Sequence, residues 1–475
     1  MHAAPHDRIT TVKDSNGNNL TNNKDCLRRW KEHFESLLNR PTQSIDPDLL
    51  TVTPPHDTPA CCTDCVTRDE VRCALNQLKK KRAPGIDGIS AELLQFGGDS
   101  IVDQLTDLIN LIWSEEEIPR EWHRGIILPF WKGKGDKLVC TNYRGITLLP
   151  VAEKLFASIL VKRAQPALTH TRRPQQAGFC HNRSTTEQIF AIRSLIQKVN
   201  EYKRSAQMYI GFIDLKAAFD SLHRPSLWKC LISSGLPDKL ISLFTNLYNG
   251  SESCVKIDTD TSEWFRHNSG VRQGCAASPN LFNCAVDRWM NRVAHRIPGL
   301  TLGNYRLTDL EYADDTTIFA QTLEELAQSL MICEEEASKI GLAINWSKTR
   351  IMTAGNAAAP NSVYINGEEV KTTSSFLYLG SKVFGQDGCV DDIQIRIAKA
   401  ARVLNSLQKH LWSQRSISRQ TKLRIYKAAV LSVLCYGSET WTWTTAQARK
   451  LNAFDTRALH RIESLRWFDF VTISS

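Results

Sequence analysis

The 475-residue sequence predicts a mixed α+β fold organised in more than one domain. Segments whose apolar residues recur every three or four positions, such as 23–39 and 280–297, indicate helices. Short apolar runs bounded by turn residues, such as 206–215, indicate strands. The composition, with 42% hydrophobic and 23% charged residues, is that of a globular chain long enough to bury a large core.

The expected elements follow one another along the chain. Helices are expected at 23–39, about 68–80, from about 90 to Trp113, 148–168, 216–235, 280–297 and about 323–340. Strands are expected at about 125–131, at 206–215, in a hairpin at 253–270, in a second hairpin around 310–320 and in short runs to about Val383. Residues 41–60 form a Pro-rich linker, and the chain beyond Val390 is mostly helical and basic.

Two features of the sequence argue against a membrane or secreted protein. It contains no run of 18 or more apolar residues, which a membrane-spanning helix requires. The N-terminal segment "MHAAPHDRITTVKDSNGNN" has no apolar core of the kind found in signal peptides. We therefore expect an intracellular protein with no membrane partner, in either the nucleus or the cytoplasm.

The 14 cysteines are scattered along the chain and show no regular disulfide framework, so we interpret them as reduced thiols. One local cluster contains His56, Cys61, Cys62, Cys65 and Cys73. Zinc sites usually show paired Cys spacings, which are missing here, so free thiols are favoured over a metal site.

Positive charge is concentrated at the C-terminal end. The formal net charge is +9, and residues 401–475 alone contain 12 Lys and Arg against 4 Asp and Glu. Four tryptophans, Trp412, Trp441, Trp443 and Trp467, are interleaved with these cations. A basic segment with aromatic residues favours nucleic-acid binding, but a solvated helical bundle with a tryptophan core would show the same pattern.

The stretch "LEYADDTTIFA" at 310–320 places Asp314 and Asp315 side by side within a predicted hairpin. A third carboxylate, Asp214, closes the apolar strand "YIGFID". Adjacent strand residues point to opposite faces, so the two neighbouring aspartates can converge only if a turn at Ala313 bends the chain. Three carboxylates at strand ends suit Mg²⁺, although Asp214 taken alone would be interpreted as a helix N-cap.

Several ordered blocks together resemble a known family. They are "KRAPGIDGISAELL", "WKGKGDK…NYRGITLL", "QQAGF…RSTTEQI", "FIDLKAAFD", "SGVRQGCAASPNLFN", "YADD", "GLAINWSKT" and "FLYLGS". In this order and at these separations they resemble the reverse transcriptases of non-LTR (LINE-like) retrotransposons. The resemblance runs from about Trp30 nearly to the C-terminus.

The resemblance implies a right-hand polymerase fold with fingers, a palm containing an antiparallel sheet, and a helical thumb. It divides the chain into an N-terminal extension at 1–69, fingers and palm at 70–355, and a basic thumb or connection at 356–475. It also implies an RNA-directed DNA polymerase, a nucleotidyltransferase that extends a primer with dNTPs during retrotransposition. The expected partners are an RNA template, a DNA primer and dNTPs, with no small-molecule cofactor.

The family pattern assigns Asp214, Asp314 and Asp315 as catalytic residues that bind two Mg²⁺ ions, for which Mn²⁺ could substitute. The carbonyl of Leu215 would complete one metal shell. Two-metal sites of this kind activate an attacking hydroxyl and stabilise the leaving phosphate.

Further positions match the nucleotide-binding residues of the family. Phe219 matches the bulky residue that excludes a 2′-hydroxyl, although the spacing is equally typical of a core aromatic. Gln273 and Gly274 match the segment that lies against the incoming base and template, where glycine permits close approach of the backbone.

Three basic residues match the family in the same way. Lys132 and Arg144 resemble finger residues that neutralise the triphosphate, and surface salt bridges are the alternative for both. Lys348 resembles a lysine that donates a proton to leaving pyrophosphate, and a solvated lysine is the alternative there.

The sequence departs from the family pattern at Cys180, where an arginine is usual, and at Ala276, where a proline is usual. It also shows neither an endonuclease domain nor a Cys/His knuckle, so we expect a truncated reading frame. Two other functions stay open. One is a catalytically decayed nucleic-acid-binding remnant of a retrotransposon, and the other is a two-metal nuclease, against which the Phe219 and "VRQG" matches argue.

Overall fold

The computed structural model describes residues 11–41, 44, 46, 54–201, 207–386 and 388–465. The chain divides into two compact units, each assembled from separate segments. The first comprises Met1–Phe179, Asp214–Arg296 and Met331–Asn345, and the second comprises Cys180–Ile213, Ile297–Leu330 and Trp346–Ser475. The division into an N-terminal extension (1–69), fingers and palm (70–355) and thumb (356–475) describes functional parts and not compact units, and it stays a prediction.

The first unit combines helices with a five-stranded sheet in which β4, β3, β6 and β7 follow one another and β8 also pairs with β6. The strands of this unit are β1 (Val12–Lys13) and β2 (Asn19–Leu20), which pair with each other, and β3 (Arg124–Trp131), β4 (Tyr143–Leu148), β6 (Glu252–Ile257), β7 (Asp260–Thr261) and β8 (Phe265–Arg266), which form the five-stranded sheet. Its helices are α1 (Asn23–Leu38), α3 (Arg68–Gln77), α4 (Ala91–Phe96), α5 (Gly98–Glu115), α6 (Val151–His170), α8 (Ala218–Ser221), α9 (Arg224–Ser233), α10 (Asp238–Tyr248) and α11 (Ser278–Arg296).

Helix α1 packs its apolar face against this sheet. Asn22 caps the helix by accepting a hydrogen bond from the Lys24 N–H at 3.1 Å. Trp30 and Phe34 stack with ring centroids 5.9 Å apart, and Trp30 meets Tyr143 of β4 edge-on at 4.9 Å. The helix predicted at 23–39 is therefore confirmed, and it belongs to the core of the first unit.

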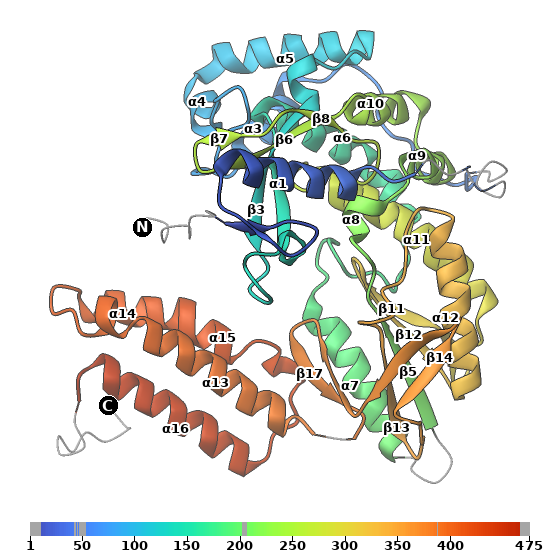
Figure 1. Cartoon of the computed structure of the whole chain (residues 1–475), viewed down its shortest axis with the longest axis vertical. Helices are drawn as coiled ribbons and strands as arrows, with labels where there is room; N and C mark the ends of the chain where they lie inside the picture. Colours follow the sequence, from blue (N-terminus) through green and yellow to red (C-terminus); the bar gives the residue numbers. More distant parts are fainter. Residues whose placement is uncertain are drawn as a thin grey trace. The chain divides into compact units, whose positions relative to one another are not determined.

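The second unit is built on a six-stranded sheet with the order β11-β12-β5-β13-β15-β14 (Figure 1). The strands of this sheet are β5 (Gln207–Ile213), β11 (Asp309–Tyr312), β12 (Asp315–Ala320), β13 (Arg350–Gly355), β14 (Ser362–Ile365) and β15 (Glu368–Thr373). Two separate hairpins of the second unit pair β9 (Leu300–Leu302) with β10 (Tyr305–Leu307) and β16 (Ser375–Tyr378) with β17 (Ser381–Phe384). Its helices are α7 (Thr185–Glu201), α13 (Val390–Ser406), α14 (Arg419–Ile425), α15 (Ser432–Leu434) and α16 (Thr445–Ile462); α12 (Leu323–Ser338) begins in this unit.

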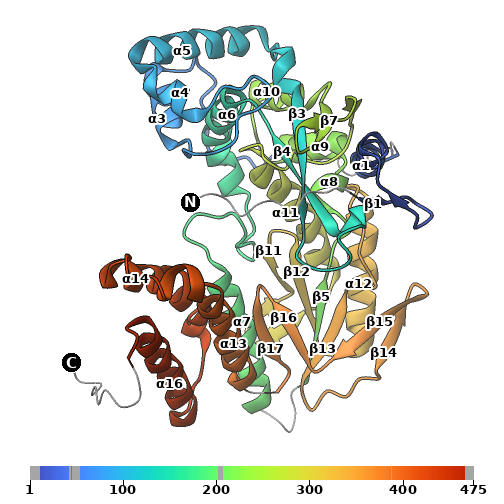
Figure 2. The ribbon, with the colours of Figure 1, turned by 60° about the vertical axis from the view of Figure 1, so that its left-hand side comes forward.

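The central strand β5 is buried on both faces, which explains its continuous apolar sequence. Ile210 and Phe212 point into a core shared with α7 and with the β16–β17 hairpin. Gly211 points the other way, where a Cβ atom would lie 3.2 Å from Leu326 and 3.5 Å from Leu330 of α12. Figures 1 and 2 show α7 and this part of α12 on opposite sides of the strand.

The helices at the C-terminal end, α13 to α16, lie beside one another and share a core of their own (Figure 1). Trp412 is 1% exposed within this core, and its Nε1–H donates to the Leu404 carbonyl at 2.7 Å. This part of the segment therefore fits the helical bundle with a tryptophan core that the sequence left open. Trp467 lies outside the described residues.

A buried carboxylate, Asp392 at the start of α13, joins these helices to the rest of the second unit. It accepts hydrogen bonds from Arg193 Nη2 of α7 at 2.9 Å and from Trp441 Nε1 at 3.0 Å. The Ser381 hydroxyl and the Lys382 N–H of β17 also donate to it, at 2.7 and 2.9 Å. Burial raises the pKa of Asp392, but the hydrogen bonds and the Arg193 charge more than offset this and hold the pKa below its usual value.

The structure confirms most of the expected elements, including the 310–320 hairpin and the helices at 280–297 and 323–340. The helix expected to end at Trp113 is wrong as one piece: it is broken into α4 and α5 at Gly98, which has a φ of 68°. Strands β1, β2 and β4 and helices α7 and α10 were not predicted from the sequence. Half of residues 41–60, predicted as a linker, lie outside the described ranges, and the described ones belong to no helix or strand. Among the described helices, none combines the length and apolar character needed to span a membrane.

Replacing Asp392 with alanine should destabilise the second unit strongly. Asp392 is fully buried, so the change leaves the half-buried Arg193 guanidinium without its counter-charge, at a cost of about 3–5 kcal/mol. Urea unfolding followed by circular dichroism measures this. The matched control is Asp391→Ala, one residue earlier and exposed, which should change the free energy of unfolding by less than about 1 kcal/mol. Equal losses for both variants would contradict the assignment.

Candidate functional site

The paired aspartates lie on the β11–β12 hairpin. Tyr312 pairs with Asp315, so the strands are joined by the two-residue turn Ala313–Asp314. Ala313 has a φ of 57°, in the left-handed region that non-glycine residues seldom adopt. Such strained residues gather at functional sites. The turn predicted at Ala313 is therefore confirmed, and both Asp314 and Asp315 are exposed at it.

The sheet register determines where the strand carrying Asp214 ends relative to this hairpin. In the antiparallel ladder of β5 and β12, Ile213 pairs with Thr316. Asp214 is the next residue after Ile213 along the chain, and Asp315 is the residue just before Thr316. The ladder thus ends at the pair Ile213 and Thr316, and each of these two residues is the chain neighbour of one predicted aspartate.

The same end of the sheet includes the start of β13. Arg350 pairs with Phe212, so β13 begins beside the end of β5. Lys348, two residues before Arg350, is exposed in the turn that leads into β13. The lysine predicted to protonate pyrophosphate therefore lies at the sheet end where β5 stops and β12 starts.

The main chain that follows Asp214 is held by the segment 343–345. The Asn345 N–H donates to the Asp214 carbonyl at 2.7 Å, and the Lys216 N–H donates to the Ala343 carbonyl at 2.8 Å. Leu215, which the sequence analysis assigned as a metal ligand through its carbonyl, forms an antiparallel bridge with Ile344. The block "GLAIN" thus stabilises the backbone immediately after Asp214.

The donor chemistry of the three aspartates suits a hard divalent cation, because carboxylate oxygens are the ligands that Mg²⁺ prefers. Within the described residues, however, no group of three or more His, Cys, Asp or Glu side chains is gathered closely enough to hold a metal ion. The chemistry of the donor atoms therefore fits the metal, and the sheet register pairs the strand ends next to Asp214 and Asp315, but the carboxylates of these described residues are not gathered into a site. Each of the 14 cysteines, including those of the His56–Cys73 cluster, is a free thiol.

Phe219 lies in α8, five residues after Asp214, and is half-buried. Its ring stacks on the fully buried Phe282 with centroids 4.3 Å apart, and it meets Phe179 edge-on at 6.2 Å. The main chain is fixed as well, because the Val271 N–H donates to the Phe219 carbonyl at 2.8 Å. The ring therefore combines a packed face with partial exposure, which suits a rigid steric gate as well as the core role left open above.

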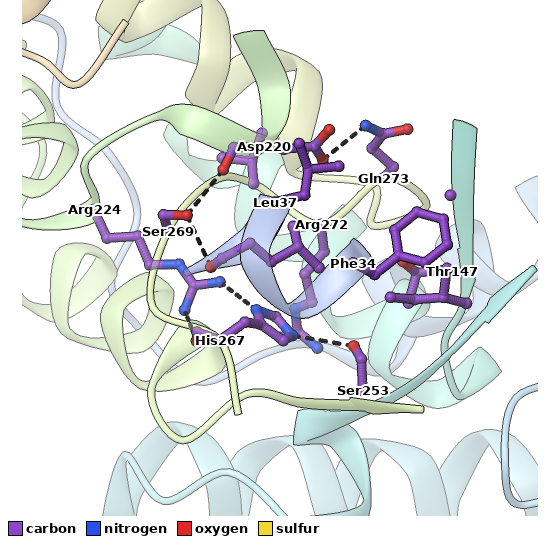
Figure 3. A pocket seen from close by; sticks show the side chains of 14 residues that line it. Phe34, Leu37, Thr147, Asp220, Arg224, Ser253, His267, Ser269, Arg272 and Gln273 are labelled. Carbon is purple, nitrogen blue, oxygen red and sulfur yellow. Dashed lines mark hydrogen bonds between the residues drawn. The ribbon is translucent and has the colours of Figure 1, made fainter. Parts of the chain in front are cut away.

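Gln273 lines a pocket of the first unit (Figure 3), and Gly274 follows it in the same tightly held loop. The Thr147 N–H of β4 donates to the Gln273 carbonyl at 2.8 Å. Gly274 has a φ of 141°, and a Cβ atom there would lie only 2.3 Å from the Thr147 carbonyl oxygen. Only glycine fits this approach, which supports the predicted reason for Gly274. The Gln273 side chain donates from Nε2 to Asp220 Oδ1 at 2.8 Å.

Asp220 is a residue that the sequence analysis did not select, although it is the second aspartate of "FIDLKAAFD". Burial raises its pKa to about 6, and the hydrogen bond from Gln273 and the charges of Lys132 and Arg40 only partly offset this. A carboxylate whose pKa is raised this far, next to a predicted nucleotide-binding residue, is itself a candidate functional residue.

A buried arginine, Arg224, holds the backbone of the same loop by hydrogen bonds. Arg224 donates to the carbonyls of Gly270 and His267 at 3.0 and 3.1 Å, and its Nη2 contacts His267 Nδ1 at 3.0 Å. Burial and the charges of Arg224 and Arg272 keep the pKa of His267 well below its ordinary value, so this histidine is neutral. Its Nδ1 therefore accepts from Arg224 and its Nε2–H donates to Ser253 Oγ at 3.1 Å (Figure 3).

Lys132 and Arg144 belong to one hairpin. Phe130 pairs with Arg144, and the Lys132 N–H donates to the Asn142 carbonyl at 2.9 Å. Because Lys132 is two residues beyond Phe130, its side chain lies on the same face of the hairpin as that of Arg144. Both are exposed, and Lys132 Nζ donates to the Thr141 carbonyl at 2.8 Å. The structure thus brings these two predicted phosphate ligands together.

The C-terminal tryptophans have different environments. Trp412 is buried and Trp441 donates to Asp392, but Trp443 is 60% exposed. On α16 the exposed cations Lys450, Arg457 and Arg461 are spaced by seven and four residues, which places them on one helix face. The segment therefore contains a tryptophan core together with an exposed basic and aromatic surface.

Comparison with known proteins gives a consistent result. A family model described as "Reverse transcriptase (RNA-dependent DNA polymerase)" matches residues 132–383. The "RNA-directed DNA polymerase from mobile element jockey" of Drosophila funebris is 25% identical over 483 residues, which cover 97% of this chain and 51% of that protein. The "Putative 115 kDa protein in type-1 retrotransposable element R1DM" of Drosophila melanogaster is 26% identical over 390 residues, covering 80% and 36%.

The chain spans about half or less of the length of the curated relatives that it matches. Among solved structures, it is similar to an apo telomerase from Candida tropicalis, with 14% identity, a TM-score of 0.38 and coverage of 60% of each chain. That structural likeness is too weak to support an argument of its own.

Proposed function

Because this chain belongs to the reverse transcriptase (RNA-dependent DNA polymerase) family, we propose that it extends a primer 3′-hydroxyl with dNTPs on an RNA template. The predicted resemblance to reverse transcriptases of non-LTR retrotransposons and the predicted α+β class are confirmed. The observation that carries the proposed reaction is the pairing of Ile213 with Thr316, which aligns the strand ends next to Asp214 and Asp315.

The reaction is a phosphoryl transfer in which the primer 3′-oxygen bonds to the α-phosphorus of the dNTP while the bond to pyrophosphate breaks. Asp214, Asp314 and Asp315, with the Leu215 carbonyl, would hold two Mg²⁺ ions, or Mn²⁺ in their place. When bound, such ions lower the cost of charge on the attacking and leaving oxygens. The left-handed turn at Ala313 places Asp314 in the turn and Asp315 at the first position of β12, and both side chains are exposed.

The remaining roles follow from position and charge. Lys132 and Arg144, on one face of the β3–β4 hairpin, bind the triphosphate oxygens. The clamped loop at Gln273–Gly274 lies against the base and template, since its backbone is fixed by Thr147. Lys348 donates a proton to leaving pyrophosphate. The positioning of these groups supplies most of the rate enhancement.

Asp314→Asn should abolish primer extension without lowering stability. The amide keeps the side-chain shape but removes the charge that a divalent cation needs, and it relieves a contact between like charges. Extension of a labelled DNA primer on RNA, together with a thermal melt, tests this. The matched control is Glu368→Gln on the exposed β14–β15 hairpin, which removes one negative charge elsewhere in the same sheet. Retention of most activity by Asp314→Asn would remove this residue from the site.

Phe219→Ala should increase incorporation of ribonucleotides relative to deoxynucleotides. Removal of the ring opens space for a 2′-hydroxyl beside Phe282. Single-turnover rates with dCTP and CTP measure the ratio. The control is Phe179→Ala, which removes the exposed ring on the edge of Phe219 and should leave the ratio near wild type. An unchanged ratio in Phe219→Ala, with lowered stability, would make Phe219 a core aromatic only.

The exposed basic surface on α16 should bind the primer–template duplex. Changing Lys450, Arg457 and Arg461 to glutamine should weaken binding to primed RNA and lower the slope of log affinity against log salt by about 0.7–0.9 for each lost phosphate contact. Substitutions are preferable to truncation at Val390, because truncation would remove Asp392 from Arg193.

Binding isotherms at several salt concentrations test this surface. The control variant changes three separated exposed lysines, Lys24, Lys198 and Lys371, to glutamine and so removes the same formal charge. A slope that falls equally in both variants would show that only net charge matters, and the binding role would move away from α16.

A further inference from the structure

The contact between Asp220 and Gln273 fixes one side-chain amide in a defined orientation. Gln273 Nε2 donates to Asp220 Oδ1 at 2.8 Å. An ionised carboxylate offers only acceptors, so the NH₂ end of the amide must face Asp220. The amide carbonyl oxygen is then turned away from Asp220, as Figure 3 shows. A carboxylate at this position therefore determines which end of Gln273 is presented outward.

The backbone around this pair leaves little other freedom. The Gln273 carbonyl is held by the Thr147 N–H at 2.8 Å, and Gly274 lies against the Thr147 carbonyl. On the other side, the Asp220 carbonyl accepts from Ser269 Oγ at 2.9 Å. With both main chains held, what Gln273 presents depends on its side-chain torsions, and the hydrogen bond to Asp220 orients its amide.

We propose that Asp220 is a positioning residue that makes Gln273 present its carbonyl oxygen, a hydrogen-bond acceptor, to a donor group of the bound nucleotide or template. This inference rests on the proposed function, because it names what the nucleotide-binding loop recognises. The recognised group is a sugar hydroxyl or a base N–H, and a carbonyl or phosphate oxygen would be rejected there. Discrimination follows because an acceptor facing an acceptor leaves both groups without a hydrogen bond.

The charges facing Asp220 are Lys132 from the end of β3 and Arg40 from the segment after α1. Lys132 and Arg40 are the basic members of this group and Asp220 is its acidic member. Burial raises the pKa of Asp220 to about 6, with a partial offset from Gln273, Lys132 and Arg40. Below that pH the protonated carboxyl can donate to the amide oxygen, and the NH₂ end can then turn outward.

A pair of exchanged substitutions tests the orientation. Gln273→Glu places a carboxylate against Asp220, and we expect extension to fall at least about tenfold because like charges repel at this distance. In the double variant Asp220→Asn with Gln273→Glu, the asparagine NH₂ can donate to one glutamate oxygen while the other oxygen points outward. That variant restores an outward acceptor, so we expect most of the lost extension rate to return.

The single variant Asp220→Asn tests the pH dependence of extension, which would not change if Asp220 had only a structural role. An asparagine can donate or accept a hydrogen bond, so it no longer determines which end of the Gln273 amide faces it. We expect the extension rate to fall several-fold, by no more than about tenfold. The wild-type protein should lose extension as pH falls through about 6, relative to Asp220→Asn, which lacks this titration. Thermal melts confirm that each variant is folded.

The outcomes separate this inference from the proposed function. If the wild-type chain extends primed RNA but the double variant is no more active than Gln273→Glu while folded, the outward acceptor is wrong. If the wild-type chain does not extend primed RNA, the proposed function fails, and the orientation is then tested alone by ¹⁵N NMR of the Gln273 side-chain amide. Its signals should shift with a midpoint near pH 6 in the wild type and stay constant in Asp220→Asn, and constant signals in both would overturn the inference.

Discussion

The antiparallel pairing of β5 with β12 on one side and β13 on the other is the constraint on which the candidate site depends. A slip of one residue in a strand exchanges its two faces. In β5 that slip would turn Ile210 or Phe212 toward α12, where even a Cβ atom at Gly211 would lie 3.1 Å from Ile318 and 3.2 Å from Leu326. The register is thus determined by the packing of apolar side chains on the two faces of β5. It fixes the strand ends that continue into Asp214 and Asp315, and the start of β13 beside them.

Two strained alanines then bend the chain at these strand ends. Ala313 lies in the β11–β12 turn and Ala217 follows β5, and both have left-handed φ values, of 57° and 48°. Each costs about 1–3 kcal/mol, which the surrounding structure has to supply. At Ala217 the support is visible, since its carbonyl accepts from the N–H groups of Asp220 and Ser221. This turn lies in the chain between Asp214, a proposed metal ligand, and the residues Phe219 and Asp220. Asp220 in turn contacts Gln273 of the nucleotide-binding loop.

Much of this could be predicted from the sequence because the signals are local. The 310–320 hairpin, the strand before Asp214 and α1 follow from apolar spacing and turn chemistry, and the family blocks mark the positions around them. The elements that were missed differ in their signals. Strand β4 reads "YRGITL" and contains a charge and a glycine. Helix α10 has apolar residues at helical spacing, so its signal is present in the sequence although it was not predicted. The break between α4 and α5 lies at the pair Gly97–Gly98, where Gly98 is left-handed; a Gly-Gly pair is a turn signal, so this break was open to prediction and was not predicted.

The tertiary parts of the site could not be predicted in this way. Asp220 and Gln273 are 53 residues apart, and nothing local to "AFD" or "VRQG" shows that they meet. The same holds for Asp392 and Arg193, which join α13 to α7, and for the burial that separates Trp412 from the exposed Trp443. These are long-range contacts between polar groups, where sequence periodicity carries no information. The family resemblance identified Gln273 and left its partner unassigned.

The measurement that tests the central claim most directly is extension of an end-labelled DNA primer annealed to RNA by the purified chain, with dNTPs and Mg²⁺. The account predicts stepwise addition to the end of the template, termination at the complementary position when one dideoxynucleotide is supplied, and no product when the metal is chelated. A chain that binds the primed RNA but adds no nucleotide would contradict it and favour a nucleic-acid-binding remnant. A primer that becomes shorter would contradict it in favour of a nuclease.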